Sequence, residues 1–198
     1  MNTIPVVYPD LPPYAVCKSI FFKDEIDKII EISKQIDVTT ALLGNTKSIS
    51  DVKVRESEVG WIYPNDEYRW LFDKMAWLIA SVNSDKYQFD LSQFDAIQYT
   101  TYNTGGFYRW HIDSQGIRTL GPTHRKLGIS VMLSDPIFDF TGGEFQIMPA
   151  GDPTLIDTIL LNKGDVVVFP SYMPHQVTPV VTGTRNCLVC WAQGPKFK

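Results

Sequence analysis

The C-terminal half of the chain is a series of short β-prone segments, and this pattern constrains the fold more than any other feature. From about residue 86, runs rich in Val, Ile, Phe, Tyr and Thr alternate with Gly, Pro and Asp. Short strands separated by turn residues are typical of a β-sandwich or a β-barrel. We expect about eight strands, over residues 95–102, 107–113, 126–133, 143–148, 155–161, 165–169, 175–181 and 185–192.

Two amphipathic helices are predicted ahead of these strands. Residues 22–36 carry isoleucines at roughly helical spacing after an acidic start, which the helix dipole favours. Residues 66–83 repeat apolar side chains at i, i+4, i+7, i+8 and i+11, and Asn65 is a suitable N-cap. The predicted fold class is therefore mainly β with N-terminal helices (α+β).

Length and composition are those of a globular chain without repeats. It has 198 residues, of which 44% are apolar and 20% charged. We expect a single domain over residues 1–198, in which a helical support region (1–90) braces a β core (91–198). The net charge of −4 gives no basic footprint, so nucleic acid is not an expected partner. No apolar run is long enough to span a membrane and no leader peptide is visible, so we predict a cytoplasmic protein without membrane contact.

The chain has three cysteines, Cys17, Cys187 and Cys190. They are too few for a disulfide framework, and an odd number cannot all be paired within the chain. Cys187 and Cys190 resemble a C-x-x-C motif, but residues three apart on a strand point to opposite faces. We therefore expect buried thiols in a reducing compartment rather than a metal site or a disulfide.

A His-x-Asp pair marks the candidate chemistry. His111 and Asp113 end the predicted strand 107–113, and alternation along a strand places them on one face. Alone, such a pair is usually a surface feature, so a third ligand is needed. The chain has only two other histidines, His124 and His175. His175 lies in a β-rich segment, whereas His124 lies in a turn-rich stretch and is expected to be solvated. Two histidines and one carboxylate form the facial triad of non-haem Fe(II) oxygenases.

A second polar feature lies on the last predicted strand. Alternation there places Arg185, Cys187, Val189 and Trp191 on one face. If this face points inward, Arg185 is a buried cation that needs an anion, and a carboxylate bound through two parallel hydrogen bonds is its natural partner. A structural salt bridge or an exposed arginine is the alternative.

The order and spacing of these motifs resemble the 2-oxoglutarate- and Fe(II)-dependent oxygenases, in particular the prolyl-4-hydroxylase-like branch of microbial and viral type. The resemblance covers roughly residues 95–192, and a weaker one covers Val54-Arg55-x-Ser57-x-Val59-x-Trp61-Ile. The matching motifs are Tyr102-x-x-Gly-Gly-x-Tyr108-x-x-His111-x-Asp113, Leu133-Ser-Asp-Pro, Gly142-Gly-Glu-Phe145, Gly164-Asp-Val-Val-Val-Phe169-Pro, His175-Gln-Val177, Gly183-x-Arg185 and Trp191.

The resemblance implies a double-stranded β-helix (jelly roll) core with Fe(II), 2-oxoglutarate and O2 as cofactor and co-substrates, and it allows ascorbate as an auxiliary reductant. His111, Asp113 and His175 match the catalytic metal ligands. Arg185 matches the residue that holds the distal carboxylate of 2-oxoglutarate. The remaining matches are to the pocket wall, with plain core packing as the alternative for the aromatic ones: Tyr102, Tyr108, Phe145, Val177 and Trp191.

One position departs from the family pattern. Members often have a tyrosine just before the leucine of the third core strand, and its hydroxyl assists the arginine. Here Met132 occupies that position, so a second donor to the distal carboxylate must come from elsewhere. The candidates are Ser130, Tyr99 and Tyr102.

The resemblance implies hydroxylation of a C–H bond, with succinate and CO2 as co-products. A prolyl or other peptidyl residue is the expected substrate, and a free amino acid or small metabolite is the alternative. A catalytically silent jelly-roll binding module is the alternative of another class. Asp113 argues against the halogenating relatives, which lack this carboxylate. Substrate contacts are expected on the loops 40–60, with Arg55 and Trp61, and 114–125.

Overall fold

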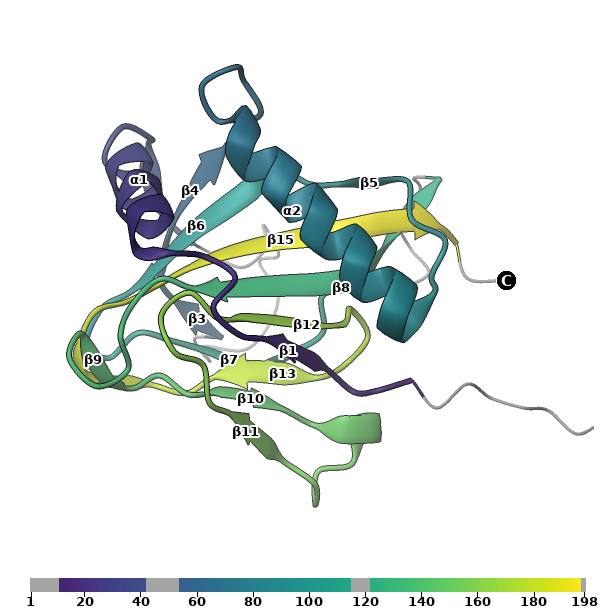
Figure 1. The fold of residues 1–198 in the computed structure, drawn as a ribbon. Coiled ribbons are helices and arrows are strands. Elements are labelled where there is room, and N and C mark those ends of the chain that lie inside the picture. The colour runs from purple at the N-terminus through teal and green to yellow at the C-terminus, as the bar shows by residue number, and fades with distance from the viewer. Residues whose placement is uncertain (1–10, 42–53, 115–121, 197–198) are drawn as a thin grey trace, which may run out of the picture.

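The computed structural model describes residues 11–41, 54–114 and 122–196 of the chain. Two sheets face one another, and the helices cover the outer side of the larger sheet (Figure 1). Its strands lie in the order β1 (Ala15–Cys17), β12 (Val166–Pro170), β8 (Thr123–Met132), β15 (Arg185–Pro195), β6 (Ile97–Tyr102), β4 (Glu58–Ile62) and β2 (Val38–Thr40), and β5 (Gln93–Phe94) pairs with β15.

The smaller sheet carries strands from distant parts of the chain. Its order is β11 (Asp157–Ile159), β10 (Phe145–Ile147), β13 (His175–Val177), β7 (Phe107–His111) and β3 (Arg55–Glu56). A separate pair joins β14 (Val180–Gly183) to β9 (Phe140–Gly142). Every strand pair in the described residues is antiparallel, as expected for a jelly roll.

Both predicted helices form, with shifted ends. Helix α1 spans Lys23–Ser33, and the Glu25 carboxylate accepts a hydrogen bond from the Phe22 backbone N–H (2.8 Å). Helix α2 spans Arg69–Val82, so it begins three residues later than predicted, and a π-helical turn, Asn83–Tyr87, follows it. Asn65 caps the preceding turn instead, because its Oδ1 accepts from the Tyr68 N–H (2.7 Å).

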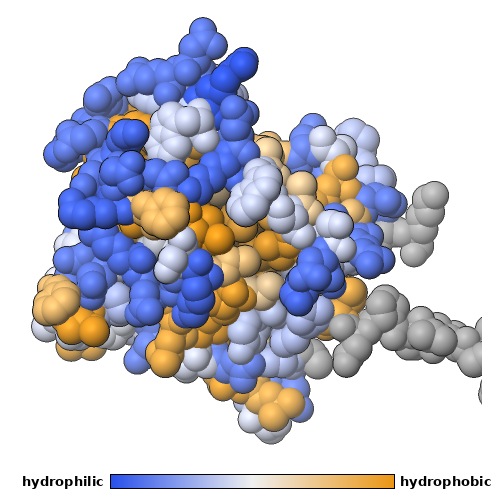
Figure 2. Space-filling model, in the orientation of Figure 1, coloured by the Kyte–Doolittle hydropathy of each residue, from blue (hydrophilic) through white to orange (hydrophobic). Residues whose placement is uncertain are grey.

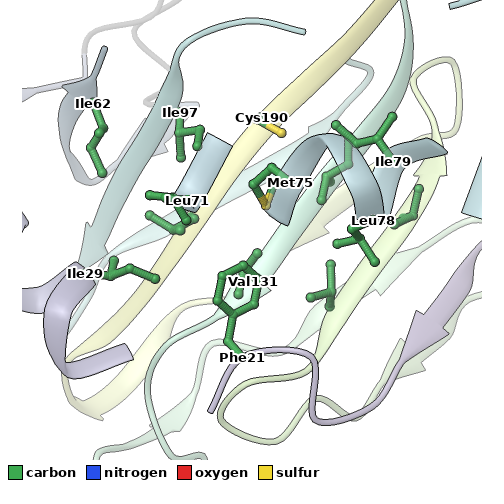
Figure 3. Close-up of a cluster of buried hydrophobic side chains, with 14 of the residues drawn as sticks. Phe21, Ile29, Ile62, Leu71, Met75, Leu78, Ile79, Ile97, Val131 and Cys190 are labelled. Carbon is green, nitrogen blue, oxygen red and sulfur yellow. The ribbon is translucent and has the colours of Figure 1, made fainter. Parts of the chain in front are cut away.

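The larger sheet separates two hydrophobic cores, and strand alternation explains both. One core fills the space between this sheet and the helices, where Leu71 and Met75 of α2 meet Val131 and Cys190 (Figure 3). The other lies between the two sheets and contains Met132 and Cys187 among others. The outer side of α1 is mainly hydrophilic in Figure 2, as an amphipathic helix requires.

Burial is confirmed for Cys187 and Cys190, whereas Cys17 is only half-buried and the placement of His124 was wrong. Cys187 and Cys190 are free thiols that belong to different cores on opposite faces of β15. His124 is half-buried within β8, opposite Gly194 of β15. β8 begins at Thr123, earlier than the predicted strand 126–133, because the long strand β15 continues its pairing with β8 as far as Pro195 opposite Thr123. Among the described residues, no helix is long and apolar enough to cross a membrane.

The turn before β12 depends on a glycine, which leads to a stability prediction. Gly164 has φ +90, and a Cβ there would lie 2.2 Å from the Phe21 carbonyl oxygen. Gly105 has a similar φ of +85 but open space around it. We expect Gly105→Ala to cost roughly 1–2 kcal/mol, the conformational strain alone. Gly164→Ala should cost more than about 3 kcal/mol, because backbone must also move.

Chemical denaturation of both variants measures this difference. The Gly164 carbonyl accepts backbone hydrogen bonds from Ile20 and Phe21 (both 3.0 Å), which connect the segment before α1 to the turn. A Cβ at position 164 would displace the Phe21 carbonyl and so disturb this connection. Equal losses of unfolding free energy in the two variants would contradict the steric argument.

Candidate metal centre

Two histidines and an aspartate converge at one end of the smaller sheet. His111 ends β7, and its antiparallel neighbour β13 places His175 directly opposite it. Asp113 lies beyond the end of β7, where its backbone N–H donates to the Ser171 carbonyl (2.9 Å). One ligand atom of each residue lies within 4.8 Å of the others. Strand pairing thus brings together residues that are 64 positions apart in the sequence, 175 − 111.

Hydrogen bonds orient both imidazole rings. His111 Nδ1 lies 2.8 Å from the Arg109 carbonyl oxygen, and His175 Nδ1 lies 2.9 Å from the Met173 carbonyl oxygen. A carbonyl oxygen only accepts, so each Nδ1 carries the proton and each Nε2 keeps its lone pair. The two Nε2 atoms face the carboxylate of Asp113, at 3.7 Å from Oδ1 and 3.5 Å from Oδ2 respectively. This is the ligand orientation that a metal ion requires.

Burial keeps one of these rings neutral. Burial, with smaller contributions from the neighbouring His175 and Arg55, lowers the pKa of His111 to about 4, although Asp113 and the Arg109 carbonyl act in the opposite direction. A neutral imidazole can ligate a metal at neutral pH without first losing a proton.

Aromatic rings enclose the cluster. The Tyr108 ring stacks on His111, with 3.4 Å between ring centroids, and the guanidinium carbon of Arg55 lies 4.6 Å from the Tyr108 centroid. The ring centroids of Phe169 on β12 and Phe145 on β10 lie 4.5 and 5.6 Å from the His175 ring centroid. The candidate ligands are therefore held by packing as well as by hydrogen bonds.

The absence of a side chain at Gly128 makes room for the carboxylate of Asp113. A Cβ on Gly128 would lie 2.9 Å from Asp113 Oδ2 and 2.7 Å from the Phe169 ring. We expect Gly128→Ala to displace the carboxylate and to weaken affinity for Fe(II) by roughly tenfold, the lower end of effects seen for residues that position ligands. Anaerobic Fe(II) titration measures this loss. Gly60→Ala is the matched control, because its Cβ would meet Ile36 in the other core; an equal loss there would contradict the prediction.

Arg185 is a fully buried cation with an incomplete set of partners. It is 0% exposed, and its Nη1 donates to the Cys187 sulfur at 3.2 Å. Its Nε and Nη2 have no hydrogen-bond partner among the described residues. A buried charge with unpaired donors is unfavourable until an anion binds. The two free nitrogens form the guanidinium edge that matches one carboxylate.

One cavity joins Arg185 to the histidine–aspartate cluster. All five residues expected in the pocket wall line it: Tyr102, Tyr108, Phe145, Val177 and Trp191. The candidate donor Ser130, the rim residue Arg55, and Cys187 and Val189 from the face of Arg185 line it too. Sequence reasoning missed two further lining residues, Gln98 and Phe169.

Of the three candidate second donors, two line this cavity and one does not. Ser130 and Tyr102 do so, and burial raises the pKa of Tyr102 to about 12, so its hydroxyl keeps its proton. Tyr99 belongs to the helix-facing core, so its candidacy was wrong. Three positions separate it from Tyr102, which places the two side chains on opposite faces of β6.

Sequence reasoning also missed a polar group beside Trp191. Both Nε and Nη2 of Arg125 donate to Asp95 Oδ2 (3.2 and 3.1 Å), and the guanidinium carbon lies 3.8 Å from the Trp191 ring centroid. Trp191 Nε1 is buried without a partner in the described residues. Trp61, predicted on the rim, is 37% exposed and lies 6.3 Å from Trp191 between ring centroids. The rim segments 42–53 and 115–121 lie outside the described residues.

Comparison with curated proteins finds relatives that share the part of the chain with this site. PKHD-type hydroxylases of Teredinibacter turnerae (34% identity over 104 residues) and Cupriavidus metallidurans (35% over 99 residues) each align with 48% of this chain. The alignments cover 42% and 41% of those proteins, so the chain spans about two fifths of the length of the curated relatives it matches.

Solved structures share the fold at low sequence identity. A Pseudomonas putida prolyl-4-hydroxylase superposes with a TM-score of 0.72 at 19% identity, covering 93% of this chain and 94% of that one. The 2OG complex of a viral collagen prolyl hydroxylase from Paramecium Bursaria Chlorella virus-1 gives 0.69 at 20% identity, covering 92% and 97%. These likenesses confirm the predicted jelly-roll core.

The family comparison matches the segment that contains the cavity. Residues 97–193 match the model of the 2OG-Fe(II) oxygenase superfamily. His111, Asp113, His175 and Arg185 all lie within that range. The segment that contains the cavity, residues 97–193, is therefore similar to the 2OG-Fe(II) oxygenase superfamily.

Proposed function

We propose that the protein is a 2-oxoglutarate-dependent dioxygenase that hydroxylates a C–H bond, with succinate and CO2 as co-products. One observation carries this proposal. A cluster of two histidines and one aspartate shares a cavity with a fully buried arginine whose Nε and Nη2 are unpaired. Binding of 2-oxoglutarate requires a metal ion for its 2-oxo acid group and a cation for its distal carboxylate.

His111, Asp113 and His175 would hold Fe(II). When bound, Fe(II) would supply O2 activation coupled to the oxidative decarboxylation of 2-oxoglutarate. Because only three protein residues would ligate it, room would remain for the co-substrate and O2. The carbonyl groups of Arg109 and Met173 fix the two imidazoles in the tautomer that ligates through Nε2. The surrounding aromatic rings exclude water from the reacting atoms.

Arg185 would bind the distal carboxylate of 2-oxoglutarate. Its two unpaired nitrogens supply parallel donors, and Tyr102 offers a protonated hydroxyl within the same cavity. Val177 and Trp191 supply apolar wall for the methylene groups. These assignments explain why a cation is buried here without a carboxylate partner in the described part of the chain.

The substrate we propose is a prolyl or other peptidyl residue. The names of the structural neighbours are those of prolyl hydroxylases, and one neighbour was solved with a peptide fragment of hypoxia inducible factor. Trp191 lines the cavity, and its buried Nε1 has no partner among the described residues, so it is a candidate donor to a substrate. A free amino acid or small metabolite is the alternative.

A succinate-release assay tests the proposal. The protein is supplied with Fe(II), 2-oxoglutarate and a panel of proline-containing peptides or free amino acids. We expect a peptide to stimulate succinate formation and to gain the mass of one oxygen atom. Stimulation by free amino acids alone would replace the peptidyl substrate with the alternative. Absence of 2-oxoglutarate binding to the Fe(II)-loaded protein would contradict the enzyme class.

A further inference from the structure

The two sides of the Arg185 guanidinium have different surroundings. Nη1 donates to the Cys187 sulfur at 3.2 Å, whereas Nε and Nη2 are unpaired. We propose that Cys187 is a positioning residue that holds Nη1, so that the Nε–Nη2 edge faces the distal carboxylate of 2-oxoglutarate. This inference rests on the proposed function and extends it, because it assigns the co-substrate grip to one edge of the guanidinium and to the residue that orients it.

The position of Cys187 on β15 suits this role. Alternation places Cys187 two residues from Arg185 on the cavity-lining face, and its backbone lies opposite Met132 on β8 and Thr100 on β6. The side chain is 2% exposed, so the sulfur stays in contact with the guanidinium instead of with solvent. Its cross-strand neighbour Met132 has no donor hydrogen.

The chemistry of sulfur suits it as well. A thiol sulfur is a weak, uncharged acceptor, so it orients the guanidinium without neutralising it. Across the described part of the chain, no carboxylate forms an ion pair with Arg185. The positive charge therefore remains available to a ligand. A hydrocarbon at position 187 would leave Nη1 unpaired and free to rotate toward the cavity.

The alternative is that Cys187 only fills space between the sheets. Cys190 provides the matched control, because it is 0% exposed on the same strand but faces the other core. Loss of either thiol removes a similar buried volume, whereas only Cys187 touches Arg185. A co-substrate analogue separates the two explanations further: 2-oxopentanoate has the carbon chain of 2-oxoglutarate but lacks its distal carboxylate.

The experiment measures binding of both acids to the Fe(II)-loaded full chain under anaerobic conditions, by visible charge-transfer absorption or calorimetry. We expect Cys187→Ala to raise the Kd of 2-oxoglutarate roughly five- to tenfold, the effect of one hydrogen bond, and to leave that of 2-oxopentanoate unchanged. Cys187→Ser retains an acceptor and should remain within about twofold of wild type. Cys190→Ala should change neither Kd.

Equal weakening of both acids by Cys187→Ala, or no weakening of either, overturns the inference. If Cys187→Ala fails to fold, Cys187→Val removes the acceptor while keeping the volume, and the same comparison applies to it. Wild-type protein that binds neither acid refutes the proposed function itself, which distinguishes that failure from a failure of the role of Cys187.

Discussion

Replacement of Asp113 by alanine is expected to abolish 2-oxoglutarate turnover while leaving the protein folded. Asp113 supplies the one carboxylate of the three-residue cluster, and only this ligand adds negative charge to balance the metal. Removing it leaves two neutral imidazoles, so Fe(II) affinity should fall by more than about 100-fold, beyond the loss caused by residues that only position ligands. The measurements are succinate formation and anaerobic Fe(II) titration.

The control for this variant is Asp73→Ala. Asp73 is exposed on α2, on the outer side of the larger sheet, so its loss changes net charge equally without touching the cavity. His111→Ala and His175→Ala should behave as Asp113→Ala does. A well-folded variant of any of the three that retains wild-type turnover would be incompatible with the metal centre.

Arg185 variants are expected to separate co-substrate binding from stability. Arg185→Met removes both carboxylate donors, so 2-oxoglutarate should bind more than about 100-fold more weakly, since truncating a buried charge partner costs 2–5 kcal/mol or more. The same change removes a buried, unpaired cation. The ligand-free protein should therefore be as stable as wild type or gain about 1–4 kcal/mol, as in replacements of buried charges by apolar side chains.

Thermal unfolding with and without 2-oxoglutarate, in the presence of Fe(II), measures both effects. Wild type should be stabilised by the co-substrate through mass action, and Arg185→Met should not. Arg185→Lys serves as the control because it keeps the charge but not the two-donor edge, so intermediate affinity is expected. Strong destabilisation of ligand-free Arg185→Met would show that the arginine has a structural partner instead.

The alternation of side chains along a single strand was sufficient to predict which residues share a face. Alternation along 185–191 correctly placed Arg185, Cys187 and Trp191 on one cavity-lining face. The pairing of His111 with His175 followed from counting histidines, and β7–β13 pairing supplies its physical basis. The prediction for Tyr99 was wrong because it rested on the tyrosine hydroxyl alone, whereas alternation along β6 places Tyr99 on the face opposite Tyr102.

The features that were missed depend on register between distant strands. Pairing of β15 with β8 brings Arg125 to Trp191. Pairing of β15 with β5 brings Asp95 to the same place, where the Asp95 N–H donates to the Trp191 carbonyl (3.0 Å). Pairing of β15 with β8 also places His124 in a strand, opposite Gly194, and not in the predicted loop. No periodicity within a segment encodes which residue of one strand faces which residue of another.

The strand β15 has no side that faces solvent along its central part. Leu188, Cys190 and Ala192 fill the core under the helices, while Arg185, Cys187 and Trp191 line the cavity. Sequence drift should therefore be slower here than in any strand with one free face, because each position is constrained either by packing or by ligand chemistry. A library randomised along this strand should tolerate few replacements. Positions that face the helices should accept only other hydrophobic residues, and positions that line the cavity should accept none.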